Sequence, residues 1–280
     1  MDVIYMKTRH LKKKKLKVKI KKSIRAKKNR SSKYEVAGTR TVRREYNGAM
    51  YDGQIENEVP NGKGTMVYPD GTRYIGNWIN GAPNGHGRMI YSSGEDYEGI
   101  WMNGRPNGQG RLLMRSGDMY EGNFENALPH GQGRIIMQSG DVYEGNWMYG
   151  VQHGIGRMTY INGDVYEGNW INGRLNGEGR MEFRNGDWYE GNWVNNNMDV
   201  GIGKIVFDNG EMYEGHIKHG EPHGTGTITQ PNGQKFGGVW ELGELNGKHV
   251  PFPRYNVNHI LKIPSVINLD YSNITRFLGL

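Results

Sequence analysis

The chain has 280 residues, of which 44 are Gly and only 35% are hydrophobic, so the apolar core is thin and Gly has a repeated structural task. It contains no Cys, which excludes disulfides, zinc–thiolate sites and a cysteine nucleophile. The formal net charge of +7 is uneven, because residues 1–44 hold 18 of the 36 basic and two of the 29 acidic residues, leaving +16 there and −9 on the rest.

Residues 1–33 form a basic arm that we expect to be disordered, because a run of like charges resists folding through its own repulsion. Three roles stay open: a solvated arm without a specific task, a contact to anionic lipid worth roughly 1 kcal/mol per basic residue, or nuclear import or nucleic-acid binding. The candidate anion-binding residues are Lys12, Lys13, Lys14, Lys15, Lys17, Lys19, Lys21, Lys22, Arg25, Lys27, Lys28 and Arg30.

Residues 34–48 follow the arm and are predicted to contain a lead-in strand. The stretch 39–46 reads Thr-Arg-Thr-Val-Arg-Arg-Glu-Tyr, and it runs into Asn47-Gly48. An Asn-Gly pair after an extended stretch is a hairpin signal. We therefore expect this strand to pair with the first unit of the repeat that follows.

A repeat of 23 residues fills residues 49–249 in nine copies, with one step of 24. Each copy places an aromatic residue two positions before a Gly; this column is Tyr51, Tyr74, Tyr97, Tyr120, Tyr143, Tyr166, Tyr189, Tyr213 and Phe236. A large apolar residue follows two positions after that Gly; this column is Ile55, Trp78, Trp101, Phe124, Trp147, Trp170, Trp193, Ile217 and Trp240. Six of the seven Trp occupy it, and a Gly-x-Gly pair follows in most copies.

The pattern Y-x-G-x-W-x-x-G-x-x-x-G-x-G, complete in residues 166–179, resembles the MORN (membrane occupation and recognition nexus) repeat. The resemblance covers about residues 49–249. It implies an all-β fold in which antiparallel β-hairpins follow one another in an elongated array that forms one twisted sheet. It also implies a scaffold, or a role at membranes, rather than an enzyme.

The residues favour the same architecture independently. Tyr143, Gly145 and Trp147 alternate and so share one face of a strand. A three-residue loop such as that around Asn162-Gly163 would keep the next strand on the same face. The predicted aromatic face consists of Tyr74, Trp78, Tyr97, Trp101, Tyr120, Phe124, Tyr143, Trp147, Tyr166, Trp170, Tyr189, Trp193 and Trp240.

Two further expectations concern Gly and the irregular step. Gly opposite a Tyr or Trp would leave room for the ring. The extra residue of the 24-residue step falls within residues 195–200, which we predict to be a loop, since an insertion in a strand would flip every later side chain.

Residues 250–280 depart from the repeat. Pro251, Pro253 and Pro264 interrupt regular structure, and an apolar stretch from Val266 to Leu278 follows. Arrays of repeats need their last unit covered, so we expect a C-terminal cap. A segment for partner binding or self-association is the alternative.

Charged and His residues in the repeats do not indicate catalysis. Glu recurs at one position in six copies and Arg or Lys at another in six, as in Glu144 and Arg157, whereas a catalytic pair is unique. Cross-strand charge pairing on a solvated face accounts for them. His130, His153 and His223 occupy a position that other copies fill with Asn, which favours a loop-forming role over a metal site. We expect no catalytic residue, cofactor or metal.

The sequence therefore predicts a non-enzymatic scaffold that binds other proteins. A peripheral membrane tether that holds anionic lipid through residues 1–33 is the first alternative, and a nuclear or nucleic-acid-associated factor using the same arm is the second. No apolar run approaches the roughly 20 residues of a membrane span, and no secretory signal precedes the arm. We expect an intracellular protein, cytoplasmic, membrane-peripheral or nuclear, and the open edges of its sheet allow a homodimer.

Overall fold

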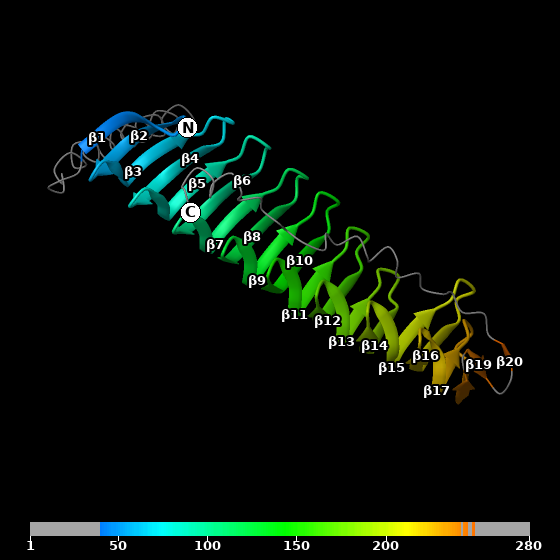
Figure 1. Ribbon diagram of the computed structural model, residues 1–280. Helices are drawn as coiled ribbons and strands as arrows, with labels where there is room; N and C mark the ends of the chain where they lie inside the picture. The colour runs from blue at the N-terminus through cyan, green and yellow to red at the C-terminus, as the bar shows by residue number, and fades with distance from the viewer. Residues whose placement is uncertain (1–39, 242, 246–247, 250–280) are drawn as a thin grey trace, which may run out of the picture.

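The computed structural model describes residues 40–241, 243–245 and 248–249; the predicted arm and C-terminal cap lie outside them. The described residues form one antiparallel sheet of 20 strands and contain no helix. Each strand pairs with the strands before and after it in the chain. The hairpins therefore follow one another along an elongated, twisted sheet (Figure 1), which confirms the all-β array.

The strand bounds are β1 (Arg40–Tyr46), β2 (Ala49–Glu56), β3 (Val59–Val67), β4 (Arg73–Ile79), β5 (Ala82–Ile90), β6 (Asp96–Met102), β7 (Arg105–Leu113), β8 (Met119–Glu125), β9 (Leu128–Ile136), β10 (Val142–Met148), β11 (Val151–Thr159), β12 (Val165–Ile171), β13 (Arg174–Glu182), β14 (Trp188–Val194), β15 (Asn197–Val206), β16 (Met212–Lys218), β17 (Glu221–Thr229), β18 (Lys235–Glu241), β19 (Glu244–Leu245) and β20 (Lys248–His249). Within the lead-in segment, β1 pairs with β2.

Two kinds of turn alternate along the array. Between β11 and β12 the Tyr160 amide donates to the Asp164 carbonyl at 2.9 Å, and Gly163 has a φ of 95°, which is the predicted three-residue loop. Between β12 and β13 only Asn172 and Gly173 turn the chain, with φ values of 51° and 75°. Two consecutive positive φ values are typical of a type I′ turn, whose twist matches that of the flanking strands.

The second strand of each hairpin is longer than the sequence suggested. β11 begins at Val151, directly after the tight turn, and includes His153 and Gly154. The pairing shifts between Gly145 and Trp147 of β10, so a bulge in β11 absorbs the extra residues. The expected loop role of His130, His153 and His223 is therefore wrong, since they lie in β9, β11 and β17.

The core is a single file of interlocked rings on one side of the sheet, the inner face. Tyr143 makes edge-to-face contacts with Trp147 of its own unit at 5.3 Å and with Trp170 of the next at 5.1 Å between ring centroids. The Trp147 indole N–H donates to the Gly133 carbonyl of the preceding unit at 3.1 Å. Each such ring pair stabilises the fold by about 0.5–1.5 kcal/mol beyond the contribution of the apolar area that it buries. Neighbouring units therefore stabilise one another.

Glycine makes room for the rings, as the sequence indicated. A Cβ on Gly156 would lie 2.3 Å from the Tyr143 hydroxyl oxygen and within 2.6 Å of two ring carbons. Gly145, directly opposite Gly156, is equally confined. The Tyr143 hydroxyl donates to the Asn146 carbonyl at 2.8 Å, which fixes the ring over this pair of glycines.

The extra residue of the 24-residue step lies in a strand, which corrects the expectation of a loop. Asn195 and Asn196 make the tight turn with φ values of 48° and 71°, and β15 starts at Asn197. Gly201 lies opposite Gly191 of β14, whereas Gly203 lies opposite Gly215 of β16. The two glycines of β15 are two positions apart, and each faces a different neighbouring strand. β15 therefore pairs in a shifted register with β14 and in the usual register with β16. The side chains that follow keep their faces of the sheet.

Candidate functional site

The aromatic columns of the inner face are sealed from solvent. In both columns, from residue 51 to residue 217, every side chain is exposed by at most 3%. Burial also raises the pKa of the Tyr143 hydroxyl above its ordinary value, and the same holds for the other seven column tyrosines. These rings hold the rod together, and none of them is accessible to a partner.

The opposite side of the sheet, the outer face, carries a ladder of alternating charge. Glu144 lies between Arg134 and Arg157 in the pairing register, and Glu167 follows Arg157. The closest contacts in the ladder include Arg180 Nη1 to Glu190 Oε2 at 2.8 Å. Without interruption, the ladder comprises Arg88, Glu98, Arg111, Glu121, Arg134, Glu144, Arg157, Glu167, Arg180 and Glu190. The cross-strand charge pairing expected from the sequence is confirmed.

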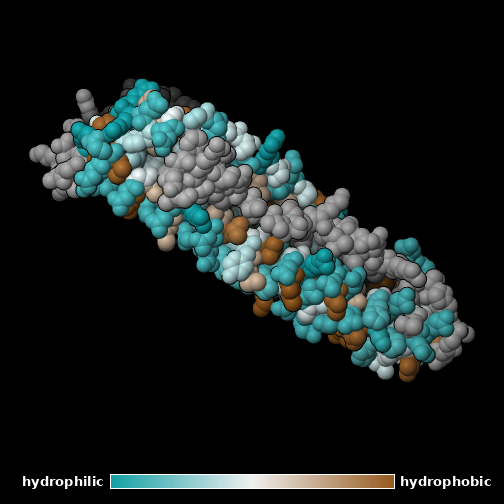
Figure 2. All heavy atoms as spheres, in the orientation of Figure 1, coloured by the Kyte–Doolittle hydropathy of each residue, from teal (hydrophilic) through white to brown (hydrophobic). Residues whose placement is uncertain are grey.

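A column of apolar side chains accompanies this ladder near the tight turns. Ile79, Met102, Ile171 and Val194 follow the Trp position in their units, point to the outer face and are about half exposed. Figure 2 shows hydrophobic side chains set among hydrophilic ones along the rod. Ile79 and Met102 are one repeat apart, as are Ile171 and Val194, which is two strands or roughly 10 Å. Between the two pairs, Glu125 and Met148 hold the same position.

The charge ladder ends where the register shifts. Glu190 of β14 faces Ile202 of β15 instead of Lys204. Lys204 of β15 still faces Glu214 of β16. Beyond this pair, Thr227 of β17 and Gly237 of β18 occupy the positions that Arg and Glu hold elsewhere. Long charged side chains thus give way to an apolar residue, a short hydroxyl and a glycine.

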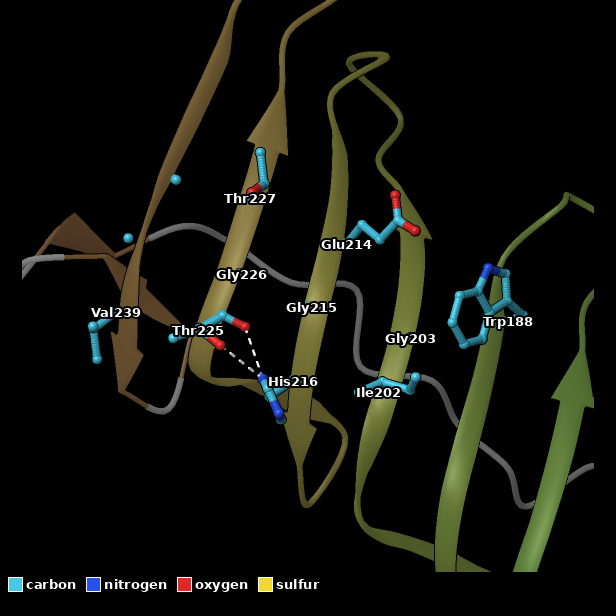
Figure 3. A pocket seen from close by; sticks show the side chains of 12 residues that line it. Trp188, Ile202, Gly203, Glu214, Gly215, His216, Thr225, Gly226, Thr227 and Val239 are labelled. Atoms are coloured by element: carbon cyan, nitrogen blue, oxygen red, sulfur yellow. Dashed lines mark hydrogen bonds between the residues drawn. The ribbon is translucent and has the colours of Figure 1, made fainter.

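These substitutions leave an open hollow of about 630 Å³ on the outer face of β14–β18. Trp188 and Ile202 lie on one side of it and Val239 on the other, with Glu214 and His216 between them (Figure 3). Ile202 and Val239 are 45% and 65% exposed, so the apolar sides face solvent.

Polar groups of the hollow are held in place from within the sheet. His216 Nδ1 lies 3.0 Å from both the carbonyl oxygen and the hydroxyl oxygen of Thr225 (Figure 3). The Arg180 guanidinium lies over the Trp188 ring, 4.6 Å from its centroid. Within the described residues, no three His, Cys, Asp or Glu side chains are grouped closely enough to hold a metal ion. The arrangement suits the binding of apolar and basic side chains.

The repeat pattern alone does not predict this hollow, although the sequence contains signals for it. Trp188 is the one Trp outside the apolar column, and Thr227 and Gly237 break the Arg and Glu columns. The residues of the predicted aromatic face, by contrast, recur regularly and lie together in the core. The candidate arm residues lie outside the described part of the chain.

Comparison with protein families settles the nature of the repeat. The MORN repeat model matches residues 51–73, 74–95, 97–119, 120–142, 143–165, 166–188, 189–212 and 213–235, which is well over half of the chain. The chain belongs to the MORN repeat family. The matches comprise eight MORN units, and the expected ninth lies beyond them; there Phe236 is 40% exposed and β19 has two residues.

Solved structures resemble the MORN array only distantly. The TCP10 domain of Danio rerio CPAP in complex with a peptide of Danio rerio STIL is 13% identical, with 66% of this chain and 83% of that chain covered and a TM-score of 0.37. The SAS-4 (dCPAP) TCP domain of Drosophila melanogaster, in complex with a proline-rich motif of Ana2 (dSTIL), is 14% identical, with 64% and 90% covered and a TM-score of 0.34. A streptogramin B lyase has a TM-score of 0.15. At these scores the likenesses carry no argument about function.

No curated protein sequence matches the chain. Where the structure describes the MORN array, it has no helix of the length and apolarity needed to cross a membrane. The eight MORN units favour a repeat scaffold.

Proposed function

We propose that this protein is a non-enzymatic scaffold that binds other proteins along the outer face of its MORN array. One observation carries the proposal: the inner rings are sealed, whereas Ile79, Met102, Ile171 and Val194 form an exposed apolar column beside the charge ladder. Single exposed apolar residues are ordinary, but two pairs of them on one face of a rigid rod, separated by Glu125 and Met148, favour an interaction surface. The charge ladder would fix the orientation of the partner.

Site-specific photocrosslinking tests this proposal. A photoreactive residue is placed at Met102 or Ile171 on the outer face and, as a control, at Ser139 in an exposed loop. We expect protein adducts in cell extract from the outer-face positions and none from the loop. An identified partner is then purified and its affinity measured for the wild type and for Met102→Asp/Ile171→Asp. Equal affinity for both would exclude the outer face as the contact surface.

A peripheral membrane tether is the second candidate, and the net charge of +16 on residues 1–44 favours it. Residues 45–280 have a net charge of −9, which makes the repeats unsuitable for binding anionic lipid. Residues 1–33 would therefore make the contact with the membrane. Flotation with anionic and neutral vesicles separates the alternatives. We expect binding to anionic vesicles alone, reduced by salt and lost when Lys12, Lys13, Lys14 and Lys15 are all changed to Glu.

Absence of flotation with the wild type would remove the membrane candidate. The arm would then be tested against nucleic acid and an import receptor. Neither result changes the expectation for the outer face, because the two proposals rest on different residues.

A further inference from the structure

We propose that the hollow on β14–β18 is occupied by the C-terminal segment of the same chain, through residues 274–278. The hollow lies at the end of the array from which that segment departs. It is apolar at its sides and acidic in its middle, and it has no counterpart in the regular MORN units. This inference does not depend on the outer-face column that carries the proposed function.

The path along the chain makes this contact short. β20 ends at His249 and pairs with β19, which pairs with β18, the strand that contributes Val239 to the hollow. At about 4.8 Å per strand, residue 250 therefore starts roughly 10–15 Å from the hollow. The 31 residues from 250 to 280 span on the order of 100 Å when extended, so residues 274–278 reach it easily. A tether of this length gives an effective concentration in the millimolar range.

The chemistry of the two partners is complementary. The hollow presents Trp188, Ile202 and Val239 around the carboxylate of Glu214. The segment Ile274-Thr275-Arg276-Phe277-Leu278 presents three apolar side chains around one guanidinium. Between residues 250 and 280 there are three basic residues and a single acidic one. The Arg276 guanidinium would share the Glu214 carboxylate with Lys204, which faces Glu214 in the pairing register.

The size of the hollow and the exposure around it also favour this occupant. A volume of about 630 Å³ suits a few large side chains and is within the usual range of ligand pockets. Val239 and Ile202, which line the hollow, are among the large apolar residues left exposed at this end of the array. Terminal units of repeat arrays need covering, and a segment joined to the last strand is the nearest source of apolar cover.

Tryptophan quenching of a bimane label tests the proposal in the full chain. Since the protein has no Cys, Gly279→Cys provides a single labelling site, and Ser31→Cys in the arm is the matched control. Bimane is quenched by contact with an exposed Trp, and Trp188 is the one Trp of the seven that is not buried. We expect quenching at position 279, its loss in Trp188→Phe, and little quenching at position 31.

Charge exchange tests the register of the contact. Glu214→Lys is expected to reduce the quenching, and adding Arg276→Glu is expected to restore it. A label at 279 with the same fluorescence in the wild type and in Trp188→Phe would overturn the proposal. Quenching that appears when labelled Trp188→Phe protein is mixed with unlabelled wild type would assign the occupant to a second copy, and so would also overturn it.

Discussion

The unit around Tyr143 and the unit around Tyr189 are built from the same motif but differ in their pairing. In the first, Gly145 faces Gly156, and Glu144 faces Arg157. In the second, one additional residue moves Gly201 opposite Gly191 and leaves Glu190 facing Ile202. The inner face keeps its rings through this change, whereas the outer face loses its ladder and gains a hollow. Core and surface are thus separable in this array, and one inserted residue alters only the surface.

The largest effect is expected from removing a core ring in a regular unit. Trp170→Ala would leave a cavity beside Tyr143 and Tyr166 and break the bond to the Gly156 carbonyl. A loss of about 3–5 kcal/mol is expected for such a truncation, measured by chemical denaturation. Trp170→Phe is the matched control and should cost far less, because Phe124 fills the same column naturally.

Adding a methyl group to Gly156 is expected to have the next largest effect. Gly156→Ala forces the Tyr143 ring out of position and should lower the free energy of unfolding by about 3 kcal/mol. Gly237→Ala in the C-terminal hollow is the control, since its Cβ would meet Thr227 Oγ1 at an ordinary 3.5 Å. A shift within about 1 kcal/mol is expected there. Similar losses of stability at both sites would contradict the finding that the Tyr143 ring packs against Gly156 whereas Gly237 has free space beside it.

Removing the additional residue should convert the second unit into the first. Deletion of Val200 restores the 23-residue spacing and is expected to place Lys204 opposite Glu190, as Arg180 is placed opposite Glu167. Trp188 would then face Val206 and the hollow would close, abolishing quenching of a label at position 279. Deletion of Ile155 from a regular strand is the control and should destabilise the array, because the spacing falls to 22. Persistent quenching after deletion of Val200 would show that the register shift does not create the hollow.

Alkaline pH should act on the whole array through the column tyrosines. Their pKa values in the folded protein are raised above the ordinary value of 10.0 by burial. Unfolded protein therefore releases these protons at lower pH than folded protein, and stability that is complete below pH 10 is lost as the pH rises further. We expect tyrosinate absorbance of the column residues to appear only together with unfolding. Gradual ionisation of a folded protein, followed by circular dichroism, would be the contrary result.

The smallest effect is expected on the charge ladder. Arg157→Glu breaks exposed pairs with Glu144 and Glu167 and should change stability by about 1 kcal/mol or less. The change should shrink further in high salt. Lys204→Glu beside the hollow is the comparison and should have an effect of similar size, since Lys204 faces Glu214 in the pairing register and its charge also acts on Asp187.

The regular part of the fold was predictable because its signals are periodic. Tyr143, Gly145 and Trp147 share a face by alternation alone, and the Asn162-Gly163 loop preserves that face. The length of β11 was not predictable in the same way, because His153-Gly154 looks like a loop, whereas Gly154 with a φ of 71° forms a bulge inside a strand.

The hollow required information that one sequence does not contain. Gly201 and Gly203 are both able to face Gly191, and the choice between them decides whether Ile202 or Lys204 lies beside Glu190. Trp188, Thr227 and Gly237 were visible as departures from their columns, yet only the pairing of β14 to β18 brings them together.

The direction of the strands has a mechanical consequence for a protein that spans two attachment points. Each strand lies across the rod, and each Trp indole of the core column donates to the unit before it, as Trp147 does to Gly133. Tension along the rod would therefore open the strand pairs in succession, beginning at an end, rather than load all of them together. Such an array resists bending through its rings but lengthens under pull one hairpin at a time, and it would behave as an extensible link with a nearly constant yield force.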